Sequence, residues 1–102
     1  MVENTPLAAF ERWVDEGWSP GLNDLPVMAL GLVGEAGEVT EIIKKHMRGD
    51  GPVSLDELEL ELGDVLHYWC RLVKYFGLDA EEIMAANIAK IEMRRGKRRV
   101  HE

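Results

Sequence analysis

Apolar residues recur every three or four positions along most of this chain, the spacing that places side chains on one face of an α-helix. The spacing predicts four helices, over about 5–16, 23–47, 54–76 and 79–96. Strict alternation of apolar and polar residues, which would indicate a β-strand, does not persist beyond a few positions. The pattern therefore predicts an all-α protein.

Each predicted helix starts at a residue whose side chain can cap the first backbone N–H groups. These capping residues are Thr5, Asn23 or Asp24, Ser54 and Asp79. Glu57 and Glu82, three residues after the last two, complete capping boxes. Gly77 ends the third helix, and the segments 17–21 and 48–52, which contain Gly and Pro, separate the others.

The apolar stripes of the last three helices predict a common core. They are Ala29, Leu32, Ala36, Val39 and Ile43; Leu58, Leu62, Val65, Trp69, Leu72 and Phe76; and Met84, Ile88 and Ile91. We therefore expect a four-helix bundle. A chain of 102 residues buries only a modest part of its surface, which favours an oligomer with a shared core. We treat residues 1–102 as one domain, with a basic tail over 96–102 that we expect to be mobile.

Composition and charge narrow the function classes. No apolar run approaches the roughly 18 residues of a membrane helix, and the N-terminus lacks the pattern of a signal peptide. The single cysteine, Cys70, excludes an internal disulfide and suits a reducing cytoplasm. The net charge is −7, but residues 1–89 alone carry −11 and residues 90–102 carry six Lys or Arg. So acidic a body makes nucleic acid an unlikely partner.

Two carboxylates interrupt an otherwise uncharged stretch of the second predicted helix. Glu35 and Glu38 are three residues apart and share a face, where like charges repel. Burial of an unpaired carboxylate is costly, so a neighbouring cation is expected. Gly31, Gly34 and Gly37 each cost a helix about 1 kcal/mol relative to alanine. We expect another helix or a ligand to approach closely there.

The third predicted helix repeats this arrangement with Glu61 and Asp64, again three residues apart and beside a glycine. Two antiparallel helices that each present a pair of acids could form an oxygen-rich site. Four carboxylates without His or Cys favour Mg²⁺, with Mn²⁺ as a substitute, over Zn²⁺. Magnesium commonly takes phosphate oxygens as further ligands, so a phosphorylated substrate is the natural partner. The alternative is that all four acids lie on solvated helix faces.

Further polar residues share these faces or form a stripe on the last helix. Tyr68 and Arg71 follow Asp64 by four and seven residues. Candidates for phosphate or substrate binding are Lys45, Tyr68, Asn87, Lys90 and Arg94. The stripe formed by the last three could equally be a solvated face. Trp13 and Trp18 could stack on a nucleobase or serve only in packing.

The order of several short blocks resembles the MazG-like all-α nucleotide pyrophosphohydrolases. The blocks are Gly34-Glu35-Ala36-Gly37-Glu38, Glu61-Leu62-Gly63-Asp64-Val65-Leu66, Gly77-Leu78-Asp79 and Asn87…Lys90…Arg94. The resemblance covers about residues 25–96. Many members of that family have a further Glu directly before the first metal ligand, where this chain has Gly34, so no role is assigned to that extra acid.

The resemblance implies a helical bundle that forms dimers or tetramers, with a nucleotide between the subunits. It implies Mg²⁺-dependent hydrolysis of a nucleoside triphosphate to the monophosphate and pyrophosphate. The metal-binding and catalytic acids would be Glu35, Glu38, Glu61 and Asp64. Asn87, Lys90 and Arg94 would lie near phosphate or sugar, and Tyr68 near the nucleoside.

Three other functions remain open on the sequence alone. The stretches Val33-Gly34-Glu35-Ala36 and Asp64-Val65-Leu66-His67-Tyr68 also resemble the phosphoribosyl-ATP pyrophosphohydrolase of histidine synthesis. The break at Gly77-Leu78-Asp79 and the stripe on the last helix favour the MazG-like enzymes. A non-catalytic helical interaction module, and a nucleic-acid binder that uses the basic tail, are the remaining alternatives.

Overall fold

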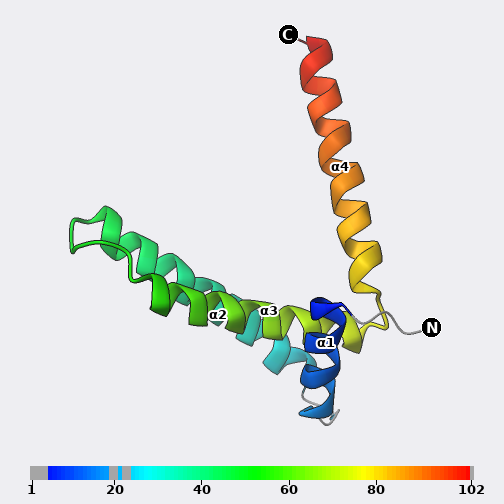
Figure 1. Cartoon of the computed structure of the whole chain (residues 1–102), viewed down its shortest axis with the longest axis horizontal. Coiled ribbons are helices and arrows are strands. Elements are labelled where there is room, and N and C mark those ends of the chain that lie inside the picture. Colours follow the sequence, from blue (N-terminus) through cyan, green and yellow to red (C-terminus); the bar gives the residue numbers. More distant parts are fainter. Residues whose placement is uncertain (1–4, 19–20, 22–23, 102) are drawn as a thin grey trace.

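Four helices make up the structure, a computed structural model that describes residues 5–18, 21 and 24–101, with side chains as far as Lys97. They are α1 (Pro6–Glu16), α2 (Asp24–Met47), α3 (Leu55–Tyr75) and α4 (Ala80–His101) (Figure 1). The described residues contain no β-strand, which confirms the all-α prediction. Within these residues, no helix is both long and apolar enough to cross a membrane.

The predicted caps hold three of the four helix starts. Thr5 Oγ1 accepts a hydrogen bond from the Ala8 backbone N–H at 3.1 Å. Ser54 Oγ accepts from the Glu57 backbone N–H at 3.4 Å. Asp79 Oδ1 accepts from the backbone N–H groups of Glu81 and Glu82, at 2.8 and 3.1 Å. The second helix starts at Asp24, and the alternative start, Asn23, lies outside the described residues.

Helix α4 is longer than predicted. It continues through Gly96 to His101, so the expected helix end near Gly96 was wrong. A single glycine in a helix costs only about 1 kcal/mol, and the residues on both sides of Gly96 are Arg and Lys, which are good helix formers. The basic segment 96–101 is therefore an extension of the helix.

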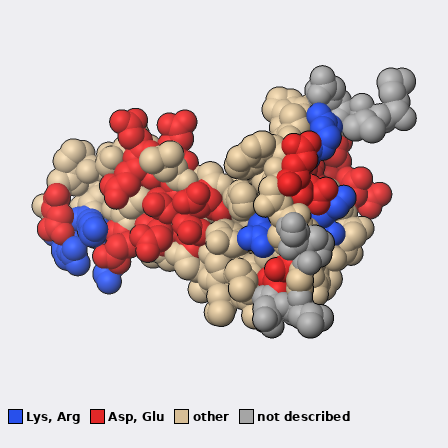
Figure 2. Space-filling view, turned by 90° about the horizontal axis from the view of Figure 1, so that it is seen from below, with Lys and Arg blue, Asp and Glu red and all other residues tan. Residues whose placement is uncertain are grey.

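Helices α2 and α3 form an antiparallel hairpin, and α1 packs against α3 at the open end of that hairpin (Figure 1). The loop between α2 and α3 turns through Gly49 and Gly51, whose φ angles of 93° and 116° favour glycine. Figure 2 shows acidic side chains gathered along the hairpin and a small basic group at its far end, where Lys44, Lys45 and Arg48 lie. Acidic and basic side chains therefore occupy different parts of the hairpin.

The residues buried in the described part of the chain form a small core of side chains from α1, α2 and α3 and from the start of α4. Its members are Val14, Met28, Cys70, Val73 and Ala80. None of these belongs to the apolar stripes predicted as core, so that prediction was wrong for a single chain. Several stripe residues are exposed instead, among them Leu62 at 50% and Phe76 at 59%. Periodicity identifies the apolar face of a helix, but it does not say whether another element of the same chain covers that face.

Helix α4 does not join the other three in a bundle within one chain. It turns away after Gly77, which ends α3 with a φ of 64°, and projects from the body (Figure 1). Its apolar side chains remain open to solvent, with Ile88 64% and Met93 65% exposed. The four-helix bundle expected from sequence is thus a three-helix body with a fourth helix extending from it.

Helices α2 and α3 approach each other closely where the Tyr68 ring lies against Gly31. A Cβ atom added to Gly31 would lie within 3.0 Å of three ring atoms of Tyr68. The close approach predicted for this glycine is therefore confirmed, and its partner is another helix. A Cβ atom added to Gly34 or Gly37 would meet no atom of another described element within 4 Å.

This contact predicts opposite effects of alanine at two glycines of α2. Gly31→Ala should lower the free energy of unfolding by about 1–3 kcal/mol, because Tyr68 must move to accommodate the methyl group. Gly34→Ala should raise it by up to about 1 kcal/mol through helix propensity. Urea unfolding of both variants and the parent measures the difference. Loss of stability in Gly34→Ala would contradict the prediction and indicate that another chain packs on α2 there.

Candidate metal centre

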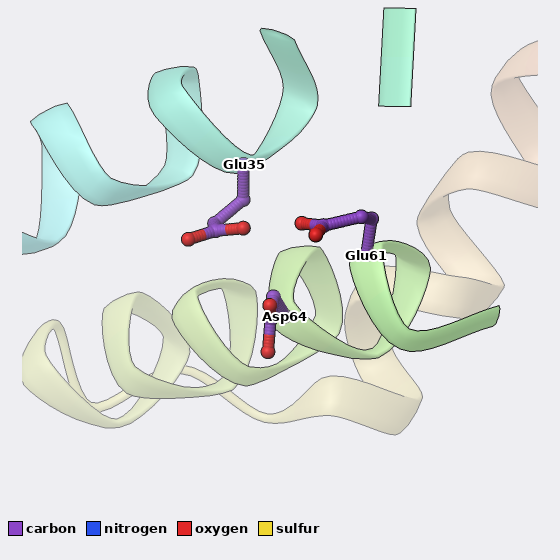
Figure 3. Close-up of side chains that lie close together, drawn as sticks. All are labelled: Glu35, Glu61 and Asp64. Carbon is purple, nitrogen blue, oxygen red and sulfur yellow. The ribbon is translucent and has the colours of Figure 1, made fainter. Parts of the chain in front are cut away.

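Three of the four predicted acids lie together between α2 and α3. Glu35 comes from α2, and Glu61 and Asp64 come from α3 (Figure 3). One carboxylate oxygen from each lies within 4.8 Å of those of the other two. Glu35 and Glu61 are half-buried, and Asp64 is exposed. We call these three residues the acid cluster.

The geometry of the acid cluster follows from the hairpin. A spacing of three residues puts Glu61 and Asp64 on one face of α3. Glu35 is four residues after Gly31, and Tyr68 is four residues after Asp64, so the close contact and the acids lie one turn apart. Because α2 and α3 run antiparallel, the Gly31–Tyr68 contact brings Glu35 opposite the two acids of α3.

The electrostatics of the acid cluster are unfavourable without a cation. Hydrogen bonding with Glu61 raises the pKa of the Glu35 carboxyl, and burial and the charges of Asp64 and Glu61 raise it further. In the described part of the chain, the side-chain ion pairs within 4.0 Å are Arg48–Asp50, Lys74–Asp15 and Arg95–Glu92. None of them involves the acid cluster.

A hard divalent cation fits this donor set. Carboxylate oxygens are the preferred protein ligands of Mg²⁺ and Mn²⁺, and a bound cation would favour the ionised form of each acid. The donor set supports the fit, because Glu35, Glu61 and Asp64 each offer a carboxylate oxygen within 4.8 Å of the others.

The fourth predicted acid does not join the acid cluster in this structure. Glu38 lies one turn along α2 from Glu35, and its side chain is exposed. Its carboxylate is not among the oxygens that lie within 4.8 Å of one another. Glu38 shares the helix face, as the spacing predicted, but a rotamer change or a further element would be needed to bring it to the same ion.

Of the predicted substrate-binding residues, Tyr68 is closest to the acid cluster. Its ring is half-buried against Gly31, one turn from Asp64. Lys45 lies in the last turn of α2, about 15 Å along the helix axis from Glu35. The two residues are therefore at different distances from any ligand bound at the acids.

The predicted stripe on α4 is not brought to the acids within one chain. Asn87, Lys90 and Arg94 are all exposed on α4, which projects away from the hairpin that carries the acids (Figure 1). In this structure, these three residues therefore do not share a site with the acid cluster of the same chain. Their role remains a prediction.

The structure also shows contacts of Arg71 that were not predicted from the sequence. The Arg71 guanidinium lies 5.5 Å from the centroid of the Trp18 ring and 5.6 Å from that of Tyr68. Trp18 Nε1 in turn donates a hydrogen bond of 3.0 Å to Asp24 Oδ2. The signal in the sequence was the placement of Arg71 on the same face of α3 as Asp64.

A family model for the MazG nucleotide pyrophosphohydrolase domain matches residues 25–99. The chain belongs to the MazG nucleotide pyrophosphohydrolase family. It is also similar to the Gene 37 protein of Mycobacterium phage L5, with 33% identity over 88 residues, which cover 76% of this chain and 77% of the phage protein. No solved structure gives a significant match.

Membership of the MazG family gives the acid cluster its context. The match contains α2 from its second residue, all of α3 and most of α4, and hence all three clustered acids. MazG domains are typically metal-dependent, and the cluster of Glu35, Glu61 and Asp64 is a possible metal site. The family also suggests nucleoside triphosphate pyrophosphatase activity, and a nucleotide as substrate.

The raised pKa of Glu35 predicts how stability changes with pH in metal-free protein. Because its folded pKa exceeds the unfolded value, its protonated form stabilises the fold. That contribution is complete below the unfolded pKa and is lost as the pH rises through the raised folded pKa. Relative to the parent, Glu35→Gln should therefore gain stability as the pH rises from about 4 to about 8.

Urea unfolding in the presence of a chelator at several pH values measures this difference. The matched control is Glu59→Gln, which changes an exposed acid on α3 outside the acid cluster. If the difference between Glu35→Gln and the parent is the same at every pH, the three acids do not interact as the structure indicates.

Proposed function

We propose that this chain hydrolyses a nucleoside triphosphate to the monophosphate and pyrophosphate in the presence of Mg²⁺. The substrate would be a deoxynucleoside triphosphate or a modified nucleoside triphosphate. The observation that carries the proposal is the convergence of Glu35, Glu61 and Asp64 from two helices inside the segment that matches the MazG family. Crowded carboxylates are unfavourable for folding, so their arrangement is best explained by a bound cation.

Four acids would hold the ion. Glu35, Glu61 and Asp64 would bind it directly, and Glu38 would complete the set after a change of rotamer. Held there, Mg²⁺ would supply positive charge for the triphosphate and would lower the pKa of a bound water. The carboxylates orient the ion relative to α2 and α3, and one of them accepts the proton of the water that attacks the α-phosphorus. Tyr68 lies one turn away, where it can contact the nucleoside.

A second copy of the chain would complete the site. The basic groups expected to stabilise the departing pyrophosphate, Lys90 and Arg94, lie on α4, away from the acids of their own chain. Apolar side chains on α4, such as Ile88 and Met93, are also exposed. We therefore propose a homodimer or homotetramer in which α4 packs against another subunit and presents its polar stripe there.

The identity of the first products tests the reaction. We expect the parent to release pyrophosphate and a nucleoside monophosphate, because the triphosphate is attacked at the α-phosphorus. Pyrophosphate, orthophosphate and nucleotide products are measured separately with and without Mg²⁺, over canonical and modified nucleoside triphosphates. Orthophosphate and a nucleoside diphosphate as initial products would contradict the proposal.

Substitution of the acids tests the metal site. Asp64→Ala and Glu38→Ala should each lower turnover by about 1,000-fold or more, because each removes negative charge that positions the ion. The metal-free variants should remain folded, since each loses one of several repelling charges. Added Mg²⁺ should raise the melting temperature of the parent, and this rise should shrink in both variants.

Glu59→Ala is the matched control for these variants, because Glu59 is an exposed acid on α3 outside the acid cluster. It should retain both turnover and the response to Mg²⁺. If the parent, Glu38→Ala and Asp64→Ala respond to Mg²⁺ identically, no metal site exists at these acids and a non-catalytic interaction module becomes the better explanation. If only Glu38→Ala behaves as the parent does, the site consists of the three clustered acids.

Subunit complementation tests the shared site. Asp64→Ala and Arg94→Ala should each be inactive alone, because one lacks an acid and the other lacks a phosphate-binding group. After mixing and exchange of subunits, a pair can combine an intact acid cluster from one copy with an intact α4 from the other. We expect the mixture to regain part of the parental activity. No recovery despite proven subunit exchange would place both residues in the same chain's site.

A further inference from the structure

A hollow lies beside the end of α1, separate from the acid cluster. Its volume is about 410 Å³, within the range of about 300–1,000 Å³ typical of small-molecule sites. Its walls combine aromatic rings with one acid, one arginine and one histidine, contributed by Trp13, Val14, Gly17, Trp18, Asp24, His67 and Arg71. The hollow therefore offers flat apolar surfaces together with a donor and an acceptor.

Arg71 is held in this hollow with an unsatisfied donor. Its guanidinium lies between Trp18 and Tyr68, within 5.6 Å of both ring centroids. Its Nε atom is buried and has no hydrogen-bond partner in the described part of the structure. That atom has almost no exposed surface, so a ligand in the hollow would not reach it. The Arg71 side chain lines the hollow, and the terminal N–H groups of its guanidinium can donate to an acceptor on a ligand there.

The hollow and the acid cluster are two ends of one seam between α2 and α3. On α3, the seam follows Asp64, Tyr68 and Arg71 at spacings of four and three residues. On α2, it follows Asp24, Met28, Gly31 and Glu35 in the opposite direction. Asp64 and Arg71 are separated by about 10 Å along the helix axis. This offset is the length that a nucleotide would span if its phosphates lay at the acids and its base in the hollow.

We infer that this hollow receives the base of the substrate, and that Arg71 and Asp24 select a base with a carbonyl group beside a ring N–H. Guanine, thymine and uracil have this pair of groups. Adenine and cytosine have an amino group beside an unprotonated ring nitrogen. The inference rests on the proposed function, because it assigns the specificity of the same nucleotide site.

The selection follows from donor and acceptor chemistry. Arg71 can only donate, and it favours the carbonyl oxygen of guanine, thymine or uracil over an amino group at the same position. The Asp24 carboxylate can only accept, and it favours a ring N–H over a ring nitrogen lone pair. It is held in place because Oδ2 accepts from Trp18 Nε1 and from the Gly21 backbone N–H. Two oxygens provide acceptor capacity beyond these two contacts.

Binding of nucleosides without metal or phosphate tests the hollow by itself. Thymidine and 5-methyldeoxycytidine form the sharpest pair, since they differ only in the carbonyl or amino group and the adjacent ring nitrogen. The readout is the shift of the indole N–H signals of Trp13 and Trp18 in ¹H–¹⁵N spectra of the full chain, assigned with Trp→Phe variants. We expect thymidine to bind at least about tenfold more tightly.

Arg71→Met and Arg71→Lys test the assigned residue. The first keeps the apolar stem, and the second also keeps the charge but lacks the planar guanidinium and its paired N–H donors. Both should reduce the preference for thymidine over 5-methyldeoxycytidine by about tenfold or more, and the ratio of kcat/KM for the two triphosphates should fall alike. The matched control is Arg48→Met, which changes an arginine at the far end of the hairpin and should leave the preference unchanged.

The outcomes separate this inference from the proposed function. If the parent releases pyrophosphate but binds the two nucleosides equally, the inference is wrong and the proposed activity stands. The same conclusion follows if Arg71→Met and Arg71→Lys remain folded by circular dichroism and keep the parental preference. If no triphosphate is hydrolysed yet thymidine binds selectively through Arg71, the hollow is a base site and the proposed reaction is wrong. Nucleoside-induced shifts confined to residues outside the hollow would also overturn the inference.

Discussion

The seating of the Tyr68 ring on Gly31 is the contact on which the rest of the site depends. It determines how closely α2 approaches α3, and the acids lie one helical turn away from it. A larger residue at position 31 would separate the helices and move Glu35 away from Glu61 and Asp64. The same ring forms one wall around the Arg71 guanidinium. One aromatic–glycine contact therefore links the geometry of the acid cluster to that of the hollow.

The acid cluster and the buried Arg71 donor each lower the stability of the folded state. Three carboxylates share a small volume, and hydrogen bonding and repulsion raise the pKa of Glu35. Arg71 adds a buried donor without an acceptor in the described residues. Burial of five residues in the described part of the chain and the hydrogen bonds of the helix caps offset these costs. A domain of this size has little stability in reserve, so ligands that satisfy both sites should contribute substantially to its folded state.

Local features of this chain were predictable from sequence, and long-range ones were not. The caps at Thr5, Ser54 and Asp79 and the pairing of Glu61 with Asp64 depend on spacings of two to three residues within one helix. The meeting of Glu35 with those acids needed only the assumption of an antiparallel hairpin. The direction of α4 was not predictable, because it depends on the turn at Gly77 and on what covers its apolar face. The prediction that Glu38 joins the other acids is not met for a related reason. A shared helix face sets the position of a side chain but not its rotamer.

The exposed apolar surface and the incomplete site argue for the same missing partner. Seven large apolar side chains of the described residues are at least 64% exposed: Leu30, Val33, Met47, Leu55, Leu60, Ile88 and Met93. Burial of each would contribute about 1.5–3 kcal/mol, so together they could offset an association cost of about 4–15 kcal/mol. They lie on α2, α3 and α4, the helices that carry the acids and the polar stripe. Gly34 and Gly37 leave room on α2 for another helix to approach, as Gly31 does for Tyr68. The helices whose exposed apolar side chains would drive self-association are thus the helices that carry the acids, Lys90 and Arg94. Assembly and completion of the site would then be a single event.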